Sequence, residues 1–450
     1  MLKINEILLC TEGNLLQGNK DLVIQFVHFD SRKIKNNALF VALPGNNVDG
    51  HQFLHAAKNN GAVAALISRT DFSTEGLEDL TLILVDNTEK AFQKIASFYR
   101  KKLRIPIIAI TGSNGKTSTK DMVTHLLSSK YHVYKTEGNL NNHLGLPLSL
   151  LQINEDHTAA VLEMGMNHKG EIDLLASIAQ PTISIITNIG ESHIEHLGSR
   201  KGIAEAKGEL LPHTSPEGFI LLNKDDEFAP VHSSLYQGKA YYFSIKEPAD
   251  AFATNLQMND KGTSFQLFLE NQEISGFIPM FGHHNVANVL PGAFIAYKLG
   301  VSLEAITAAL YSLSVSDMRF QLIEGPSDSI LINDAYNASP SSMKAAIHTF
   351  EHIYPGRRKV LVLGDIFELG AESERLHKEV GEYLLGKEMV LLTVGKNASL
   401  ISEIAGGTHY QEKREVIEAL KPYLNENHAI LFKASRGMKL EEIIHSISAI

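Results

Sequence analysis

The feature that most constrains the fold is a glycine-rich loop between an apolar run and a helical pattern. The run Ile107–Ile110 is short and mostly β-branched, which predicts a buried strand, and the residues after Lys116 predict a helix that continues through Leu127. Glycines in such a loop let successive backbone N–H groups turn toward one anion, and the helix N-terminus adds a positive dipole. This order of elements predicts a phosphate-binding loop in an α/β sheet.

The loop departs from the usual G-x-x-x-x-G-K-[ST] pattern, because Ile110 stands six positions before Lys116. The strand before the loop and the helix after it favour ATP-type phosphate binding over a glycine turn with a solvated lysine. Lys116 can reach the β- and γ-phosphates, and the Thr117 hydroxyl can bind Mg²⁺. The predicted phosphate ligands are Gly112, Ser113, Asn114, Gly115, Lys116, Thr117 and Ser118.

Short apolar runs alternate with amphipathic stretches along all 450 residues, as in α/β proteins. At roughly 150 residues per domain, this length predicts about three domains. We expect them over residues 1–103, 104–316 and 317–450, and the alternation over 240–281 predicts an antiparallel excursion. Further strands are expected at 38–43, 62–67, 81–85, 159–162, 183–187, 219–222, 330–332, 360–363, 390–394 and 430–432, and helices at 52–60, 89–102 and 371–385.

Charge and composition exclude several classes of protein. The chain has 41 Lys and Arg against 51 Asp and Glu, so its formal net charge of −10 argues against nonspecific nucleic-acid binding. Its single cysteine permits no intrachain disulfide. No apolar run approaches the ~20 residues that span a bilayer, and the N-terminus lacks the features of a signal peptide. We expect a soluble cytoplasmic monomer that inserts into no membrane.

Two polar residues follow strands that neighbour the loop. Glu163 comes directly after the apolar run 159–162, where an acid commonly holds Mg²⁺ beside a phosphate loop. Taken alone, such a glutamate is more often a solvated strand end or a helix cap. His193 follows the predicted strand 183–187 at the carboxyl edge of the sheet, where α/β sites form. It is either a metal or phosphate ligand or, as most loop histidines are, merely solvated.

Together, the phosphate loop, Glu163, His193 and Ala206-Lys207-Gly-Glu209 resemble the Mur ligase family, the ATP-dependent amide-forming ligases of peptidoglycan synthesis. The remaining motifs follow in the family's order. The C-terminal ones look like the branch that adds D-alanyl-D-alanine, and the first two resemble its UDP-binding domain. These motifs are Asp30-Ser-Arg32, Gly45–His51, Gly282–Asn288, Met318–Gln321, Asn333–Pro340, Leu363–Gly370 and Lys433–Met438.

The resemblance implies an N-terminal UDP-substrate domain, a central ATP-binding parallel-sheet domain and a C-terminal Rossmann-like ligase domain. It implies that ATP phosphorylates the carboxylate of UDP-N-acetylmuramoyl-tripeptide. The amine of D-alanyl-D-alanine then attacks the acyl phosphate, a tetrahedral intermediate forms, and phosphate leaves. The physical need is clear, because a carboxylate repels nucleophiles and lacks a leaving group.

The resemblance also implies residue roles. Lys116, Glu163, His193 and Lys207 are the expected catalytic residues. Two Mg²⁺ sites are expected, the first held by Thr117 and Glu163, the second by His193, with Lys207 carbamylated so that it becomes an anionic ligand. Further ATP contacts are expected from Asn285, Asn288, Arg319, Asp334 and Tyr336. Substrate contacts are expected from Ser31, Arg32, Asp49, Asn139, Asn142, Asp365, Lys433, Ser435 and Arg436, with Glu368 beside the incoming amine.

Without the resemblance, Lys207 would be interpreted as a surface lysine, Asn285 and Asn288 as helix caps, and residues 433–436 as a solvated basic loop. Three alternatives to the ligase remain open: a folylpolyglutamate synthase with the same core, a phosphate-loop switch or motor, and an inactive relative. The N-terminal motifs argue against the first, and the intact catalytic set argues against the last. A site shared between domains predicts closure on nucleotide binding.

Overall fold

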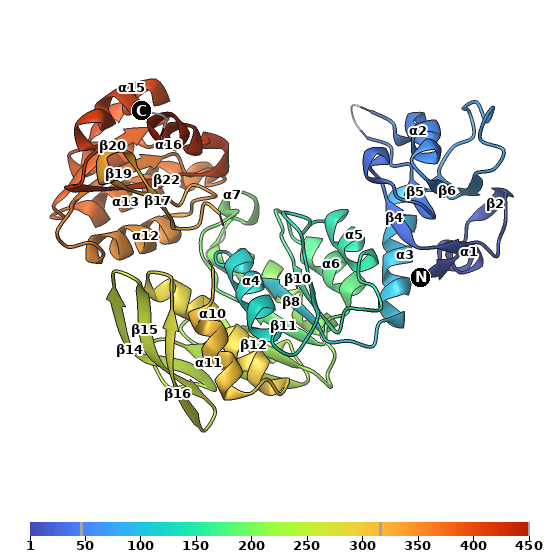
Figure 1. The fold of residues 1–450 in the computed structure, drawn as a ribbon, viewed down its shortest axis with the longest axis horizontal. Helices are drawn as coiled ribbons and strands as arrows, with labels where there is room; N and C mark the ends of the chain where they lie inside the picture. The colour runs from blue at the N-terminus through green and yellow to red at the C-terminus, as the bar shows by residue number, and fades with distance from the viewer. Residues whose placement is uncertain (46–47, 315–316, 449–450) are drawn as a thin grey trace.

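The computed structural model describes residues 1–45, 48–314 and 317–448, and it has the predicted α/β class. Three successive blocks of the chain each build a main sheet, with the N-terminal and C-terminal blocks on opposite sides of the central one (Figure 1). Residues 46–47 of the Gly45–His51 motif and the predicted boundary at 316 lie outside the described residues, and the domain limits stay a prediction.

The N-terminal block has a five-stranded sheet that is parallel except for its first strand. In spatial order the strands are β2 (Asn14–Gln17), β7 (Thr81–Leu84), β6 (Ala62–Ile67), β5 (Ala38–Val41) and β4 (Phe26–His28). A separate two-stranded ribbon joins β1 (Leu2–Lys3) to β3 (Val23–Ile24). The helices are α1 (Ile4–Thr11), α2 (Leu54–Asn59) and α3 (Thr88–Lys102). The helix predicted at 52–60 begins instead as a 3₁₀ turn over Gly50–Phe53.

Helix α3 connects this block to the next. The Asn87 side chain caps its N-terminus by accepting from the Lys90 backbone N–H. Its apolar stripe is buried, and the Tyr99 hydroxyl donates to the Ile153 carbonyl in the central block. Buried Arg100 donates to the carbonyls of Ala179 and Gln180. These hydrogen bonds connect the N-terminal block to the central block.

The central block contains a nine-stranded sheet. In spatial order its strands are β16 (Gln272–Ile278), β15 (Gly262–Leu269), β14 (Ala251–Asn259), β13 (Lys239–Ser244), β12 (Phe219–Asn223), β11 (Ile183–Ile186), β8 (Ile107–Thr111), β10 (Ala159–Glu163) and β9 (Val133–Lys135). The antiparallel excursion predicted from residue 240 is wrong for β13, which pairs parallel with both β12 and β14. The antiparallel pairs in the described part of this sheet are β14–β15 and β15–β16, because hairpins join these strands, whereas β13 follows a helical crossover from β12.

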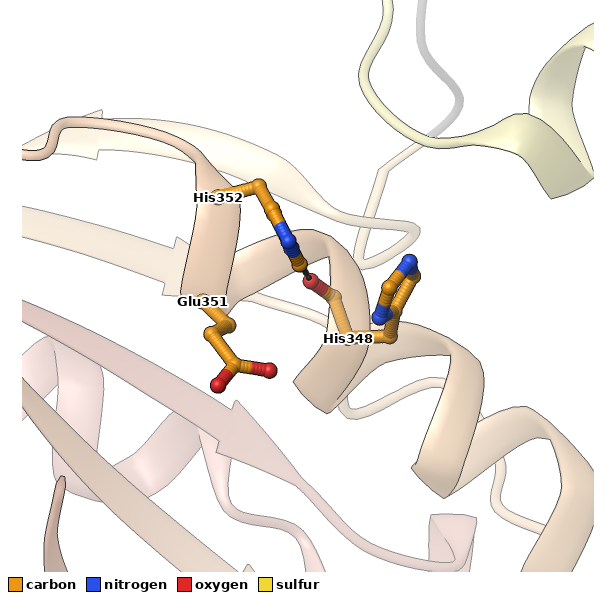
Figure 2. A group of neighbouring side chains, drawn as sticks. All are labelled: His348, Glu351 and His352. Atoms are coloured by element: carbon orange, nitrogen blue, oxygen red, sulfur yellow. Dashed lines mark hydrogen bonds between the residues drawn. The ribbon is translucent and has the colours of Figure 1, made fainter. Parts of the chain in front are cut away.

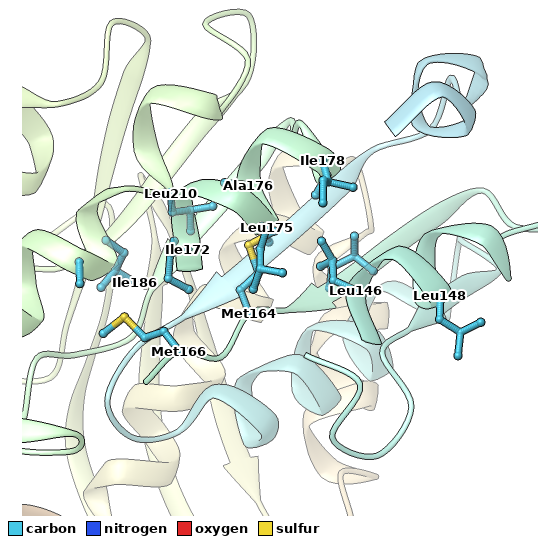
Figure 3. Close-up of a cluster of buried hydrophobic side chains, with 14 of the residues drawn as sticks. Leu146, Leu148, Met164, Met166, Ile172, Leu175, Ala176, Ile178, Ile186 and Leu210 are labelled. Carbon is cyan, nitrogen blue, oxygen red and sulfur yellow. The ribbon is translucent and has the colours of Figure 1, made fainter. Parts of the chain in front are cut away.

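Alternate residues of β8 point into two cores on opposite faces of the sheet. Ile108 and Ile110 pack with the buried faces of α4 (Lys116–Leu127) and α10 (His283–Lys298). Ile107 and Ala109 pack with residues of α5 (Gly145–Leu151) and α6 (Glu171–Ala179), a cluster drawn in Figure 3. The remaining helices of this block are α7 (Ile194–Leu197), α8 (Arg200–Gly208), α9 (Ala229–Ser234) and α11 (Leu303–Tyr311).

The C-terminal block has a six-stranded sheet, parallel apart from its first strand. In spatial order the strands are β17 (Gln321–Glu324), β18 (Ile330–Asn333), β22 (His428–Lys433), β19 (Arg358–Gly364), β20 (Met389–Val394) and β21 (Thr408–Tyr410). The helices are α12 (Pro340–His352), α13 (Ser373–Leu384), α14 (Ser399–Ala405), α15 (Lys413–Leu420) and α16 (Glu441–Ser448). Across the described ranges, no helix is long and apolar enough to cross a membrane.

Candidate active site between the central and C-terminal domains

The phosphate loop joins β8 to α4 as predicted. Gly112 and Gly115 have φ values of 150° and 79°, and a Cβ at Gly112 would lie 1.8 Å from the Thr187 hydroxyl. The Ser113 N–H donates to the Asn188 carbonyl, which fixes the loop to the end of β11. Ile110 replaces the first glycine of the usual pattern because this position still belongs to β8 and its side chain is fully buried.

Glu163 ends β10 beside this loop, and the residue is 4% exposed. One oxygen accepts the Thr117 hydroxyl at 2.9 Å and the other accepts the Asn141 amide at 2.9 Å. The Lys120 ammonium lies 3.9 Å from the first oxygen. The loop thus presents a hydroxyl and a buried carboxylate side by side, both of them oxygen donors of the kind that Mg²⁺ prefers.

The two lysines of the predicted catalytic set are both buried. Lys116 Nζ donates to the Gly112 carbonyl at 2.7 Å, and burial lowers the pKa of Lys116. Lys207 is 1% exposed, and over the described part of the chain it has no side-chain hydrogen bond or ion pair. Burial first, and the nearby Lys116 charge second, hold the pKa of Lys207 well below its ordinary value. Such an environment favours the neutral amine, the form that reacts with CO₂.

His193 is placed by an unusual backbone conformation and by the C-terminal domain. It stands at the start of α7 with φ 65°, and its Nδ1 lies 2.5 Å from a carboxylate oxygen of Glu368. The adjacent imidazole lowers the pKa of Glu368, against the opposing effect of burial. The Glu195 N–H also donates to the Glu368 carbonyl. His193 therefore faces a carboxylate across the domain boundary.

The C-terminal domain brings a cation onto the loop. Arg319 donates to the Thr117 hydroxyl at 3.0 Å, and its guanidinium lies over the Tyr336 ring, 4.2 Å from the centroid. Asp334 accepts from the Phe320 N–H and from Lys433 Nζ, the latter at 2.7 Å. In this arrangement Lys433 is a buried counter-ion of Asp334.

A cavity of about 730 Å³ lies between the two domains. A second cavity of about 490 Å³ shares Asn188, Arg200, His284 and Asn288 with it. A third, of about 280 Å³, shares His193 and Tyr336 and is also lined by Glu368, Ser435 and Arg436. The predicted residues that line the first cavity are Ser113, Asn114, Gly115, Lys116, Thr117, Ser118, Asn139, Asn142, Glu163, His193, Asn285, Asn288, Arg319, Asp334, Tyr336 and Lys433.

Two predicted ligand-binding residues, Asn285 and Asp365, use their side chains to bind the protein's own backbone. The Asn285 amide donates to the Phe281 carbonyl, although the residue also lines the cavity. Asp365 is 5% exposed and lines none of the three cavities; its carboxylate accepts from the backbone N–H groups of Lys396, Asn397 and Ala398. The structure places Asp365 as an anchor for the turn before α14.

The N-terminal candidates lie apart from these cavities. Asp30 accepts two hydrogen bonds from the Arg32 guanidinium, whose side chain is 87% exposed, while the Ser31 side chain is buried. Asp49 lies 2.6 Å from the His51 ring and 2.8 Å from Arg69. None of the three predicted residues lines the phosphate-loop cavity, so their substrate role stays a prediction.

Sequence reasoning missed several residues that complete the site. Asn141 lies between the predicted residues Asn139 and Asn142, and its amide donates to the Glu163 carboxylate. The asparagine-rich segment Asn139–Asn142 was the sequence feature that could have identified it. Asn114 of the loop exchanges hydrogen bonds with Ser339 and Ser341 at the start of α12. Ser-Pro at a helix start indicates a cap, but nothing local indicates a partner 225 residues away.

Comparison with known proteins agrees with this architecture. Three family models match: "Mur ligase family, catalytic domain" over residues 23–106, "Mur ligase middle domain" over 110–296 and "Mur ligase, glutamate ligase domain" over 318–436. The UDP-N-acetylmuramoyl-tripeptide–D-alanyl-D-alanine ligase of Bacillus subtilis is 41% identical and aligns over 94% of this chain and 93% of its own.

Solved structures show the same similarity in three dimensions. MurF from Acinetobacter baumannii is 31% identical, has a TM-score of 0.91 and matches 100% of this chain and 99% of its own. MurF ligase from Thermotoga maritima in complex with ADP is 26% identical with a TM-score of 0.85, over 96% of this chain and 99% of its own. By its matching domains and its full-length similarity to these enzymes, the chain belongs to the Mur ligase family.

Proposed function

We propose that the chain is an ATP-dependent ligase that joins D-alanyl-D-alanine to UDP-N-acetylmuramoyl-tripeptide, in the cytoplasmic synthesis of peptidoglycan precursors. The observation that carries the proposal is the cavity between two domains, with a phosphate loop on one wall and Arg319 on the other. The name of the 41% identical relative, which aligns over 94% of this chain, supports the choice of substrates.

The reaction needs two anionic reactants to meet, because ATP phosphates and a substrate carboxylate repel one another. Lys116 and Arg319 both line the cavity and offset that repulsion. The backbone N–H groups at the N-terminus of α4, which the helix itself leaves unpaired, hold the phosphates. Positioning with charge neutralisation accounts for most of the rate in such transfers. The substrate carboxylate takes the γ-phosphoryl group, the amine then attacks the acyl carbon, and phosphate leaves.

The oxygen donors beside the loop fit Mg²⁺. Thr117 and Glu163 form one pair; the buried Glu163 carboxylate accepts from the Thr117 hydroxyl and the Asn141 amide, and Lys120 Nζ lies 3.9 Å from one of its oxygens. Bound there, Mg²⁺ neutralises charge on the β- and γ-phosphates. We place a second site at His193, with Lys207 as a carbamate. The burial of Lys207, and its lack of a hydrogen-bond or ion-pair partner among the described residues, support that assignment.

The domain limits 1–103, 104–316 and 317–450, a monomeric state and closure on nucleotide binding belong to the same proposal. The N-terminal residues Ser31, Arg32 and Asp49 contact the UDP end of the substrate, and Ser435 and Arg436 contact the peptide or the dipeptide carboxylate. Arg436 and Glu368 line a common cavity with His193, which supports this placement.

A coupled phosphate-release assay tests the proposal. Phosphate should appear only when ATP, Mg²⁺, UDP-N-acetylmuramoyl-tripeptide and D-alanyl-D-alanine are all present. Phosphate release without the dipeptide would indicate a hydrolytic switch or motor. Turnover with a folate and glutamate in place of the muramyl substrate and dipeptide would indicate a folylpolyglutamate synthase. Either result would overturn the proposed function.

A further inference from the structure

A cluster of metal-binding side chains lies outside the active site, at the C-terminal end of α12. His348, Glu351 and His352 project from the last turns of this helix (Figure 2). Their ligand atoms all lie within 4.8 Å of one another. Residues at i, i+3 and i+4 share one face of a helix, so the backbone itself holds the three side chains together.

The His352 ring is oriented by a backbone contact of its own helix. Its Nδ1 lies 2.8 Å from the His348 carbonyl oxygen, drawn as the dashed line in Figure 2. Because a carbonyl only accepts, this contact selects the tautomer with the proton on Nδ1, which leaves Nε2 as the metal-binding atom. A ligating histidine typically donates its other ring N–H to a carbonyl or carboxylate, which fixes the tautomer and the ring orientation.

The two rings are accessible, and the carboxylate keeps one oxygen for an ion. His348 and His352 are exposed, so small rotations can bring their nitrogens to the metal–nitrogen distance of about 2.0–2.1 Å. One Glu351 oxygen lies 2.5 Å from Lys387 Nζ, and the other has no hydrogen bond or ion pair with the residues that the structure describes. A carboxylate oxygen thus remains for an ion.

The cluster lies at the boundary between two domains. The His348 ring is 6.3 Å from the ring of His283, the first residue of α10 in the central domain. A Cβ on the preceding Gly282 would lie 2.4 Å from the Thr349 hydroxyl of α12, so the two helices touch there. The first turns of both helices line the phosphate-loop cavity, through Asn285 and Ser341.

We propose that His348, Glu351 and His352 form a binding site for a divalent transition-metal ion of the zinc class. Two imidazoles and one carboxylate suit Zn²⁺, Co²⁺ or Ni²⁺, whereas Mg²⁺ prefers oxygen ligands alone. The site is therefore chemically distinct from the oxygen donors at Thr117 and Glu163. It lies on the seam between the central and C-terminal domains, and it does not depend on which reaction the enzyme performs.

Titration of the full-length protein with Co²⁺ tests the site, in excess Mg²⁺ so that both proposed active-site metal positions are filled. We expect one Co²⁺ per chain by calorimetry, with visible absorption bands of a nitrogen-ligated ion. The double variant His348→Ala/His352→Ala should lose this binding. His445→Ala, an exposed histidine on α16, is the matched control and should keep it. No Co²⁺ binding by the wild type, or unchanged binding by the double variant, would overturn the proposal.

Two further variants test Glu351 as a ligand. Glu351→Gln should weaken Co²⁺ binding at least about tenfold, since even the loss of an outer-shell partner costs that much. Lys387→Met should tighten binding, because it removes the ammonium that lies against the carboxylate. Unchanged affinity in both variants would contradict the three-residue site. None of these measurements depends on ligase turnover.

Discussion

The guanidinium of Arg319 donates a hydrogen bond of 3.0 Å to the Thr117 hydroxyl, although 202 residues separate the two in the sequence. Thr117 also donates to Glu163, so the three side chains form a chain that crosses from one domain to the other. The proposed metal ligand on the phosphate loop is thereby in direct contact with a cation from the C-terminal domain.

Replacing Arg319 should therefore affect both chemistry and domain arrangement. We expect Arg319→Ala to lower kcat at least about 10²–10³-fold, the usual effect of removing one preorganised hydrogen-bond donor that stabilises the transition state. Arg319→Lys should recover part of the activity, because it keeps the charge but not the planar fork. Steady-state kinetics measures the loss, and small-angle scattering with ATP shows whether closure is impaired. Near wild-type kcat in Arg319→Ala would contradict the role.

Glu163→Gln removes a charge while keeping the shape of the side chain. Its amide oxygen can still accept from Thr117, so the fold should persist, but the oxygen pair beside the loop loses its negative charge. We expect kcat to fall about 10²–10³-fold and the Mg²⁺ concentration for half-maximal rate to rise. Glu205→Gln, an exposed residue on α8, is the matched control. An unchanged Mg²⁺ dependence would rule out Glu163 as a ligand.

Lys207 should carry a carbamate when the enzyme is active. With ¹³C-labelled bicarbonate, NMR should show one carbamate signal in the wild type that is absent from Lys207→Arg. The arginine keeps the positive charge but cannot react, because its guanidinium stays protonated. Ligation by Lys207→Arg should be almost abolished. Full activity in that variant, or an identical carbamate signal, would show that Lys207 remains an ordinary amine.

Local pattern predicted much of this molecule. The strand at Ala62–Ile67 and the helix end at Leu127 agree with their predicted positions, and Glu163 lies where a strand-end acid should. Buried strands and glycine-rich loops can be predicted locally, because each requires a particular pattern of neighbouring residues. Contacts between domains have no such local pattern. The pairing of His193 with Glu368, for example, depends on how the central and C-terminal blocks dock.

Asp365 is a residue for which the predicted substrate role and the observed contacts differ. The family resemblance implied a substrate contact for Asp365, yet its carboxylate accepts three backbone N–H groups of the turn 396–398. The geometry favours a structural role. Gly395 is part of this arrangement, since a Cβ there would lie 2.7 Å from the Asp365 carboxyl carbon.

Asp365→Ala should accordingly lower stability more than it alters substrate binding. Hydrogen bonds to a charged, buried acceptor contribute about 1.5–3 kcal/mol each, and their loss leaves N–H groups unpaired. We expect a lower thermal unfolding temperature for the C-terminal domain, with KM for the dipeptide close to that of the wild type. Glu388→Gln, exposed in the same domain, should change neither quantity. A raised KM without loss of stability would favour the substrate role.

The free energy of unfolding of the N-terminal domain should decrease in mild acid because of His28. Burial lowers the pKa of His28 to about 4, and its Nδ1 accepts the Asp30 N–H at 2.8 Å, so the folded state holds the neutral ring. An unfolded histidine has a pKa of about 6.5. Between these two values the unfolded state binds more protons than the folded state, so its free energy falls as the pH drops.

We therefore expect the free energy of unfolding of this domain to decrease by roughly 1–3 kcal/mol between about pH 6.5 and pH 4 through this one group. His28→Asn supplies the contrast, since its amide oxygen can accept the same N–H but does not titrate. Hydrogen exchange of peptides from β4, β5 and β6 measures the local stability in both proteins. The pH dependence should be shallower in His28→Asn; parallel curves would show that His28 titrates alike in both states.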